Sequence, residues 1–491
     1  MLDDALNDGF AWLCRSDGLA GDCRVTRRGF LRSSALAAFA FGLSWHATEG
    51  VAQTPDAQPN IVFILADDMG FSDLSADGAR GYETPVLDKL ASEGVRFTQA
   101  YANSPVCSPS RVALLTGRYP GNFQAGLEEP NVRFAPGTEL PIGTPTVASL
   151  LGDAGYQTAL VSKWHVSAVP EFNPTRYGYD SFFGIKGGSA DYFLHRANQA
   201  PDKPMTGLFE NDMPVKRDGY LTDIIADEAI KVIEGKSDQP LFLSVHFTAP
   251  HSPWEGPGDA DRAATISATQ DRNGGSVEIY ANMMKSLDQN VGRVLDALDE
   301  AGLAENTLVV FTNDNGGERF SNNWPLIGYK GEVLEGGIRT PTIVRWPDVV
   351  PAGSTTEQVA ISMDMMPTLL AAANASIPED MEGMNLLPVL TGAGEVTERT
   401  LFWRMKSNGQ AAVRHGDWKY VRIKQSEHLF DLAADQRERV DLAVVHPDIL
   451  ADLRQKFDDW NGRMLTYPED SISSDVTRSG IYVDRYRPAG Q

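Results

Sequence analysis

Four short apolar runs in the sequence are each followed almost at once by charged or polar residues. The runs are Asn60–Leu65, Gln157–Val161, Leu241–Val245 and Leu308–Phe311. The groups that follow them are Asp67-Asp68, Lys163-Trp164-His165, Pro250-His251 and Asp314-Asn315. In open α/β sheets, ligands bind outside the carboxyl ends of the parallel strands. We therefore expect the four runs to be strands that deliver their polar residues to one convergent site.

Most of the remaining chain alternates short apolar runs with amphipathic segments. This pattern predicts an α/β fold, with a large mixed, mostly parallel sheet flanked by helices on both faces. One helix is expected to begin at Pro85, with Thr84 as its cap and Gly94 at its end. A second is expected from Tyr280 to about Ala301, with one apolar face.

The sequence changes in character after about Leu390. Residues 401–404, 411–414 and 418–422 are typical of short antiparallel strands, and a helix is expected from about Pro447 to Trp460. We therefore predict a smaller C-terminal α+β subdomain built on a short antiparallel sheet. The predicted divisions are a signal peptide at 1–52, a catalytic domain at 53–390 and a C-terminal subdomain at 391–491.

Composition excludes several classes of protein. The chain has 491 residues, 42% of them hydrophobic and 22% charged, as in an ordinary globular protein. No apolar run reaches the roughly 18 residues that a membrane span needs. Lys and Arg number 43 and Asp and Glu number 66, which gives a net charge of −23. Such a chain repels phosphate backbones, so we expect no nucleic-acid partner, and an anionic substrate would need a local cationic pocket.

The N-terminal region resembles a twin-arginine signal peptide. Arg27-Arg28 precedes an apolar stretch from Ser33 to Trp45, and small residues suited to cleavage follow at Gly50-Val51-Ala52. We expect the Tat machinery to export the folded protein, which would be periplasmic or secreted. The region before Arg27 is long and contains acidic residues, so the true start could lie further along the chain. The alternative is a chance pair of arginines before a buried helix.

The polar residues after the four runs include a set of hard oxygen ligands. Asp67, Asp68 and Asp314 offer carboxylates and Asn315 an amide oxygen, which suits Ca²⁺ or Mg²⁺ and lacks the ligands that zinc favours. Each group also has a structural interpretation. Asp67-Asp68 could form a solvated turn, Asp314-Asn315-Gly316-Gly317 is a good turn sequence, and a single histidine is more often structural.

Cys107 is the one cysteine left after the predicted cleavage, because Cys14 and Cys23 lie within the signal. Pro109 suits the first turn of a helix, so Cys107 is expected at a helix N-terminus, where negative charge is favoured. Arg111 lies about one turn further on the same side. Two other interpretations remain: a small buried thiol before an ordinary helix, or an unmodified nucleophilic cysteine.

Together these residues resemble the sulfatase family of the alkaline-phosphatase superfamily. The resemblance covers about Pro59 to Trp460 and rests on motifs that occur in the family's order. They are Asn60 to Gly70, Cys107-x-Pro109-Ser110-Arg111 with Leu115-Thr116-Gly117-Arg118, Lys163-Trp164-His165, Pro250-His251, Asp314 to Gly317, Gly328-Tyr329-Lys330-Gly331, and Glu335-Gly336-Gly337-Ile338-Arg339.

The resemblance implies that a formylglycine-generating enzyme converts Cys107 to formylglycine, or 3-oxoalanine, whose hydrate is the nucleophile. One hydroxyl of the hydrate attacks sulfur and expels the alcohol, and the second allows the sulfate ester to collapse back to the aldehyde. The resemblance also implies that Asp67, Asp68, Asp314 and Asn315, with modified Cys107, hold Ca²⁺ in preference to Mg²⁺. Asp314 would also be the base for the attacking hydroxyl.

The remaining roles follow from the same resemblance. Arg111 and Lys163 would fix the nucleophile and neutralise sulfate charge, and His165 would take the proton from the second hydroxyl. His251 and Lys330 would bind sulfate oxygens and protonate the leaving alcohol. Contacts to the alcohol are expected from Trp254, Arg319, Asn322 and Trp324. The chain departs from the family at Ser162, at Val166-Ser167 and at residues 318–325, which are expected to shape the mouth of the pocket.

Three functions are compatible with this sequence. The first is a sulfuric ester hydrolase acting on an alkyl, aryl or carbohydrate sulfate. The second is a phosphonate monoester or phosphodiester hydrolase with the same nucleophile and metal, because the two anions are alike in size and geometry. The third is a non-catalytic protein that binds sulfated glycans.

Overall fold

The structure is a computed structural model that describes residues 58–79, 81–132, 134–196, 207–266 and 274–474. The predicted signal peptide at 1–52 lies outside the described residues. The described residues, 58–474 with their gaps, belong to a single compact unit. The predicted domain boundary near residue 390 stays a prediction.

The strands of the main sheet are β1 (Asn60–Ala66), β2 (Val95–Phe97), β4 (Gln157–Ser162), β5 (Ser181–Gly184), β6 (Leu208–Glu210), β7 (Met213–Val215), β8 (Leu241–His246), β9 (Thr307–Asn313), β10 (Thr342–Arg345) and β11 (Ser354–Thr356). Their order is β11-β2-β10-β9-β1-β8-β4-β5-β6-β7. The five strands from β9 to β5 are parallel, whereas β10, β6 and β7 pair antiparallel with their neighbours. The sheet is mixed and mostly parallel, as predicted.

The four predicted runs are the neighbouring strands β9, β1, β8 and β4. Every residue of β1 is buried, because the sheet is covered on both faces. Ile61 and Phe63 pack in one apolar cluster, and Val62 and Ile64 pack in the other. The alternation of side chains along a strand explains why the run is apolar throughout. The carboxyl ends of these four strands therefore lie side by side.

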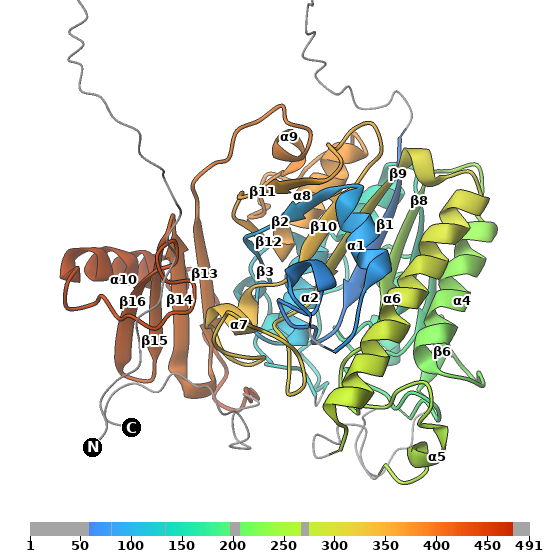
Figure 1. Ribbon diagram of the computed structural model, residues 1–491, viewed down its shortest axis with the longest axis horizontal. Coiled ribbons are helices and arrows are strands. Elements are labelled where there is room, and N and C mark those ends of the chain that lie inside the picture. The colour runs from blue at the N-terminus through green and yellow to red at the C-terminus, as the bar shows by residue number, and fades with distance from the viewer. Residues whose placement is uncertain (1–57, 80, 133, 197–206, 267–273, 475–491) are drawn as a thin grey trace, which may run out of the picture. The chain divides into compact units, whose positions relative to one another are not determined.

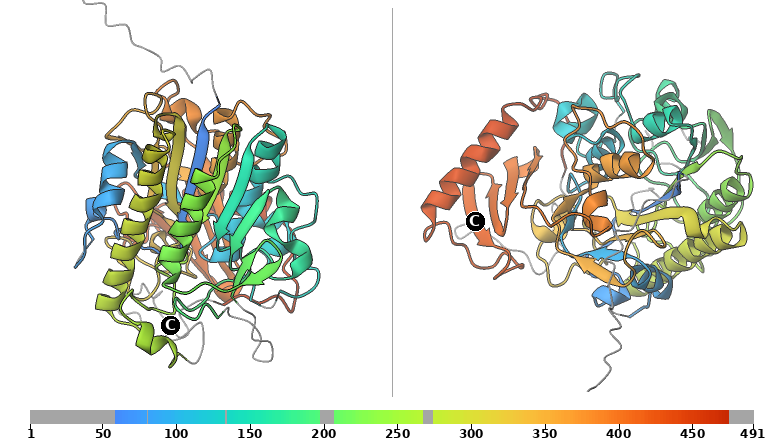
Figure 2. Two further views of the ribbon diagram at one scale, coloured as in Figure 1. Left: turned by 90° about the vertical axis from the view of Figure 1, so that its right-hand side faces the viewer. Right: turned by 90° about the horizontal axis from the view of Figure 1, so that it is seen from above.

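The helices are α1 (Pro85–Ser92), α2 (Cys107–Thr116), α3 (Val147–Asp153), α4 (Leu221–Glu234), α5 (Ala260–Ala263), α6 (Val277–Glu300), α7 (Glu335–Ile338), α8 (Met365–Ala372), α9 (Leu387–Leu390) and α10 (Pro447–Asn461). Apolar residues of α1, α4 and α6 pack on one face of the sheet, and residues of α2, α3 and α8 pack on the other. Figure 2 shows α4 and α6 lying in front of the strands.

The predicted cap of α1 is wrong in detail. The Thr84 hydroxyl accepts from the backbone amide of Ser75 and makes no capping hydrogen bond to α1. The carboxylate of Asp288, on α6, instead accepts from the amides of Val86 (3.2 Å) and Leu87 (2.9 Å). A residue about two hundred positions away thus satisfies the first turn, which local sequence rules do not detect.

A four-stranded antiparallel sheet lies in the C-terminal part of the chain (Figure 1), in the order β13-β14-β15-β16. Its strands are β13 (Thr400–Met405), β14 (Gln410–His415), β15 (Trp418–Ile423) and β16 (Ser426–Asp431). The helix α10 packs against it through Leu453, Phe457 and Trp460. The predicted α+β unit is confirmed, and β16 is a strand that the sequence analysis did not identify. Two short strands, β3 (Ala100–Tyr101) and β12 (Ala360–Ile361), form a separate parallel pair.

Candidate active site

The carboxyl ends of β1 and β9 bring the predicted acidic residues together. The amide nitrogen of Asn315 donates to a carboxylate oxygen of Asp68 at 2.8 Å. One ligand atom from each of Asp67, Asp68, Cys107 and His251 lies within 4.8 Å of the others, and all four residues are buried. His251 thus joins a cluster in which the sequence analysis had not placed it as a ligand.

Asp314 lies at the border of this cluster and is paired with Arg111. Its Oδ2 atom accepts from the Arg111 guanidinium at 3.1 and 2.9 Å, whereas its Oδ1 atom is buried with no hydrogen-bond partner. The Oδ1 atom of Asn315 is also buried without a partner. Such buried acceptors cost free energy unless something satisfies them.

These residues fit a divalent cation bound among oxygen ligands. Burial, reinforced by the charges of Asp314 and Asp68, raises the pKa of the Asp67 carboxyl to about 7 despite its contact with Lys163. The two free oxygens of Asp314 and Asn315 and the crowded carboxylates are what a hard cation would satisfy. The donor set therefore supports the predicted metal site.

Cys107 is the first residue of α2, as predicted, and is 1% exposed. Its sulfur lies 3.6 Å from Oδ1 of Asp67. Burial and the nearby charge of Asp314 raise the pKa of the thiol far above its ordinary value. An unmodified cysteine here would stay a protonated thiol, which is a poor nucleophile.

Three cationic side chains surround the carboxylates. The ammonium group of Lys163 lies 2.5 Å from Asp67, and that of Lys330 lies 2.7 Å from Asp68. Arg111 also donates to the backbone oxygen of Lys163 at 3.0 Å. Burial alone would lower the pKa of Lys330, but the charge of Asp68 outweighs that effect. The net pKa is raised well above the ordinary value, so the group is an ammonium ion. The site therefore contains three buried cations paired with three buried carboxylates.

The two predicted histidines are buried and neutral. Burial, with the charges of Lys163 and Lys330 respectively, lowers the pKa of His165 and of His251 well below the ordinary value. Nε2 of His165 lies 3.0 Å from the backbone oxygen of Asn131, so it carries the hydrogen, and the partnerless Nδ1 atom is free to accept a proton. Nδ1 of His251 bonds the backbone oxygen of Ser252, which leaves Nε2, at 3.5 Å from Asp68, as an electron-pair donor.

Two further residues belong to this region and were not predicted. His246, the last residue of β8, lies 3.3 Å from Arg111 and 3.1 Å from the backbone oxygen of Lys163. It follows a predicted strand run directly, which is the signal that could have identified it. Ser189 has a buried hydroxyl without a partner. Its neighbour Gly188 lies against His165, so closely that a Cβ there would come within 2.6 Å of the imidazole ring.

The loop 318–325 holds three of the four residues predicted to contact the alcohol, and the fourth is Trp254. Trp324 is 50% exposed, and the guanidinium of Arg437 lies 4.1 Å from its ring centroid. Arg319 lies over the ring of Phe320 at 4.7 Å. Trp254 is buried and packs edge-on against Phe320.

The fourth predicted contact, Asn322, has a role within the protein. Its amide nitrogen donates to the backbone oxygens of Ser72 (3.0 Å) and Gly78 (3.3 Å), so it holds the loop in place. Its backbone also lies so close to Gly70 that a Cβ there would come within 2.6 Å of the Asn322 carbonyl oxygen. Tight packing at this point fixes the loop beside the residues that follow Asp67 and Asp68.

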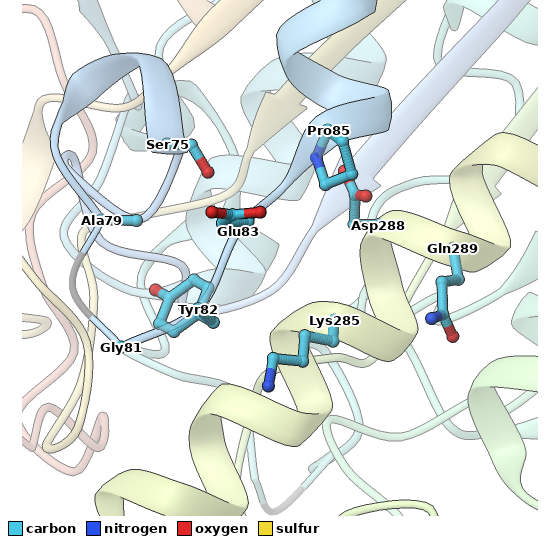
Figure 3. A pocket seen from close by; sticks show the side chains of 9 residues that line it. All are labelled: Ser75, Ala79, Gly81, Tyr82, Glu83, Pro85, Lys285, Asp288 and Gln289. Carbon is cyan, nitrogen blue, oxygen red and sulfur yellow. The ribbon is translucent and has the colours of Figure 1, made fainter.

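A separate pocket of about 750 Å³ lies between the start of α1 and α6 (Figure 3). None of its nine lining residues is a predicted site residue; they are Ser75, Ala79, Gly81, Tyr82, Glu83, Pro85, Lys285, Asp288 and Gln289. The acidic residue on the α6 side of the pocket is Asp288, whose carboxylate caps α1. Lys285 is one cation among two carboxylates, so the pocket is not built to hold an anion.

Comparison with known families gives two matches. A model of the sulfatase family matches residues 59–375. A model described as the C-terminal part of N-sulphoglucosamine sulphohydrolase matches residues 329–460. The two regions overlap in the segment that contains Lys330.

Individual relatives agree with these matches. The dog N-acetylgalactosamine-6-sulfatase is 33% identical over 395 residues, covering 75% of this chain and 72% of that protein. Human arylsulfatase A is 32% identical, covering 80% of this chain and 81% of that protein. The crystal structure of Ps i-CgsB in complex with k-i-k-neocarrahexaose superimposes with a TM-score of 0.75, at 29% identity, and covers 87% of this chain and 97% of that one. In the described part of the chain, no helix combines the length and apolar character that membrane crossing requires.

Proposed function

The chain belongs to the sulfatase family and is a sulfuric ester hydrolase, and we propose that it cleaves the sulfate ester of a carbohydrate with formylglycine at residue 107 and a bound Ca²⁺. The observation that carries the proposal is the cluster formed by Cys107, Asp67, Asp68 and His251, flanked by two buried lysines. The carbohydrate class is supported by relatives named for a sulfated amino sugar and by the neighbour solved with an oligosaccharide.

The cation would be held by Asp67, Asp68, Asp314 and Asn315 together with residue 107. When bound, it would act as a Lewis acid toward the sulfate oxygens. The balance of charge supports its presence. Three carboxylates offset the three cationic side chains, so a divalent ion leaves an excess of two positive charges. That excess matches the charge of a released sulfate ion.

The modification of Cys107 is supported by the surroundings of the thiol. A buried cysteine whose pKa is raised cannot supply a thiolate, so the family's conversion to formylglycine gives this position the hydroxyl nucleophile that the thiol cannot provide. Asp314 is assigned as the base that takes the proton of the attacking hydroxyl. Arg111 orients that carboxylate through two hydrogen bonds.

The other side chains neutralise charge and move protons. Lys163 and Lys330 lie beside the carboxylates and would bind the sulfate oxygens as the ester S–O bond breaks. The departing alcohol would take its proton from Lys330, which lies with His251 beside Asp68 and is the protonated member of that pair. His165 takes the proton of the second hydroxyl at Nδ1, the ring atom that the structure leaves without a partner. Nε2 keeps its hydrogen on the Asn131 carbonyl, which holds the ring in this orientation.

Substrate choice is assigned to the loop 318–325. Trp324 offers a half-exposed indole face for a sugar ring, and Arg319 and Arg437 offer cations for further anionic groups. Both arginines lie over aromatic rings, which fixes their planes and lowers the entropy lost on binding. An anionic sugar would find these cations on a chain whose net charge is otherwise −23.

Maturation would require two partners. A formylglycine-generating enzyme would act on Cys107 before folding, because the side chain is buried afterwards. The Tat machinery would then export the folded protein to the periplasm or beyond, directed by the twin-arginine sequence at 1–52.

The test is sulfate release by purified protein with Ca²⁺ and with formylglycine confirmed by mass spectrometry of the peptide containing residue 107. We expect turnover of sulfated amino sugars or sulfated oligosaccharides, with a higher kcat/KM than for aryl sulfates. Preferred cleavage of phosphonate monoesters or phosphodiesters would overturn the substrate class. Binding of a sulfated ligand without turnover by the modified protein would overturn the catalytic role.

A further inference from the structure

The segment 327–339, which we call the Lys330 segment, contains Lys330 and the short helix α7. On one side it contacts the loops of the proposed catalytic centre. The amide of Lys330 donates to the backbone oxygen of Gly317 at 3.1 Å, and the amide of Gly331 donates to that of Pro105 at 2.8 Å. Gly317 follows Asn315 by two residues, and Pro105 precedes Cys107 by two.

On its other side the Lys330 segment contacts Gln410, the first residue of β14. Gln410 is 4% exposed. Its Nε2 atom donates to the backbone oxygen of Gly331 at 2.8 Å, and its Oε1 atom accepts from the amide of Val333 at 3.1 Å. One side-chain amide thus satisfies two buried backbone groups in the residues that follow Lys330 directly.

Gly331 is held on both sides. Its φ of 87° lies in the left-handed region, so the chain turns at this residue immediately after Lys330. Its N–H group is bound to the loop that precedes the nucleophile, and its C=O group is bound to the C-terminal sheet. Removing the Gln410 amide would leave both Gly331 and Val333 with an unpartnered buried group, and the turn would shift to satisfy them.

The second half of the Lys330 segment is held by the same sheet through charge. Lys419, on β15, is fully buried between the carboxylates of Glu335 (2.9 Å) and Glu438 (2.8 Å). Glu438 also accepts from the backbone amide of Glu335 at 2.7 Å, at the start of α7. Figure 1 shows α7 beside the C-terminal strands. Lys419 and Glu438 fix α7, which leaves Gln410 to fix the residues next to Lys330.

We propose that Gln410 is a positioning residue for Lys330, through which the C-terminal sheet sets where the ammonium group lies. The proposal rests on the role of Lys330 proposed above. A catalytic group displaced by about 1 Å can lose on the order of a hundredfold in rate. Within the described residues, the hydrogen bonds of the Gln410 side chain go to Gly331, Val333, Met405 and Ser407 and to no predicted site residue. Gln410 therefore acts through the backbone that carries Lys330.

The test is a double-mutant cycle on a carbohydrate sulfate, with Gln410→Met combined with Lys330→Met. We expect Gln410→Met to lower kcat about tenfold or more when Lys330 is present. In the Lys330→Met background the same change should lower kcat less than about twofold, because the group it positions is already gone. KM should change less than kcat. Gln410→Glu keeps the acceptor for the Val333 amide, but its ionised carboxylate has no hydrogen to donate to Gly331. Its kcat should therefore lie between those of the wild type and Gln410→Met.

Gln358 provides a matched control. It is also buried, and its amide bridges the backbone of Val359 and Thr397, away from the Lys330 segment. Gln358→Met should lower kcat by a similar small factor in both backgrounds. Equal losses for Gln410→Met in the two backgrounds would overturn the proposal, since a purely structural role costs the same in each.

Hydrogen exchange separates this proposal from the proposed function. In Gln410→Met, the Val333 amide should exchange about tenfold faster or more, whereas Gln358→Met should leave it unchanged. If the wild type turns over no sulfate ester but this exchange pattern appears, the proposed function fails while the hold on the Lys330 segment stands. If exchange at Val333 is unchanged in Gln410→Met, the positioning proposal fails whatever the activity.

Discussion

The sulfur of Cys107 lies 3.6 Å from Oδ1 of Asp67, while Oδ2 of the same carboxylate lies 2.5 Å from Lys163. Asp67 therefore lies between residue 107 and the Lys163 side chain and contacts both. Any nucleophile built at this position starts beside both a carboxylate and an ammonium ion. Several expected outcomes follow from this arrangement.

Cys107→Ser should convert a turnover enzyme into one that reacts once. A serine hydroxyl can attack sulfur and expel the alcohol, but it lacks the second hydroxyl needed to release sulfate. We expect steady-state turnover to fall on the order of a thousandfold or more. Intact-mass spectrometry should show the gain of one sulfo group per protein. Cys107→Ala is the control and should gain none, and sustained turnover by Cys107→Ser would contradict the mechanism.

Removal of the bound cation should destabilise the protein. Chelation leaves Oδ1 of Asp314 and Oδ1 of Asn315 as buried acceptors without a partner, so the melting temperature should fall and recover when Ca²⁺ is added. At a cation concentration one hundred times Kd, the stabilisation is about 2.7 kcal/mol. Scanning calorimetry of wild type and Asn315→Ala measures this. A Ca²⁺-dependent shift of the same size in Asn315→Ala would mean that the ion binds elsewhere.

Trp324→Ala should weaken the use of long substrates without affecting short ones. Loss of the indole face removes a stacking surface worth roughly 1 kcal/mol, so kcat/KM for a sulfated oligosaccharide should fall about fivefold to tenfold, mainly through KM. Activity on an aryl sulfate should change little. The control is Trp418→Ala, because Trp418 lies on β15 of the C-terminal sheet and packs against His446. Equal losses on both substrates would place Trp324 outside the binding surface.

Ionisation of the buried Glu129 carboxyl should lower the free energy of unfolding as the pH rises from 4.5 to about 7. Burial raises the pKa of its carboxyl to about 7 from an ordinary 4.5, although Ser473, Tyr467 and the Lys406 amide donate to it. Between these two values the folded state holds a proton that the unfolded state has lost. Stability from this group is therefore greatest below pH 4.5 and is lost as the pH rises through 7.

The matching variant is Glu129→Gln, which cannot ionise. Relative to wild type it should gain up to about 3 kcal/mol in free energy of unfolding between pH 4.5 and pH 8. Urea denaturation at several pH values measures the difference. Parallel curves for the two proteins would show that the pKa of Glu129 is not raised.

The part of the site that was predictable from sequence is the part made by strand ends. Asp67, Lys163, His251 and Asp314 each follow an apolar run within a few residues, and parallel strands place their carboxyl ends together. The four strands β9, β1, β8 and β4 are neighbours in the sheet, so their carboxyl ends lie side by side whatever the order among them. The gathering of these polar residues could therefore be predicted without the strand order.

The contacts that complete the site depend on pairings between distant segments. Gln410 reaches Gly331 across 79 residues, and Asp288 caps α1 across about two hundred. No periodicity in the sequence marks either residue, because each one satisfies backbone groups that belong to another element. The burial of Trp254 was not predictable for a related reason, since Trp254 packs against Phe320, which is also remote in sequence.

The pairing of β1 with β8 and β9 has a consequence for the timing of synthesis. Asp314 follows Arg111 by 203 residues, so β9, whose carboxyl end carries Asp314, leaves the ribosome long after the helix that begins at Cys107. At about 5–20 residues per second, that interval is roughly 10–40 s. A sheet that closes this slowly would give the proposed modifying enzyme many seconds to reach residue 107, whereas a fold built from local contacts would close within microseconds.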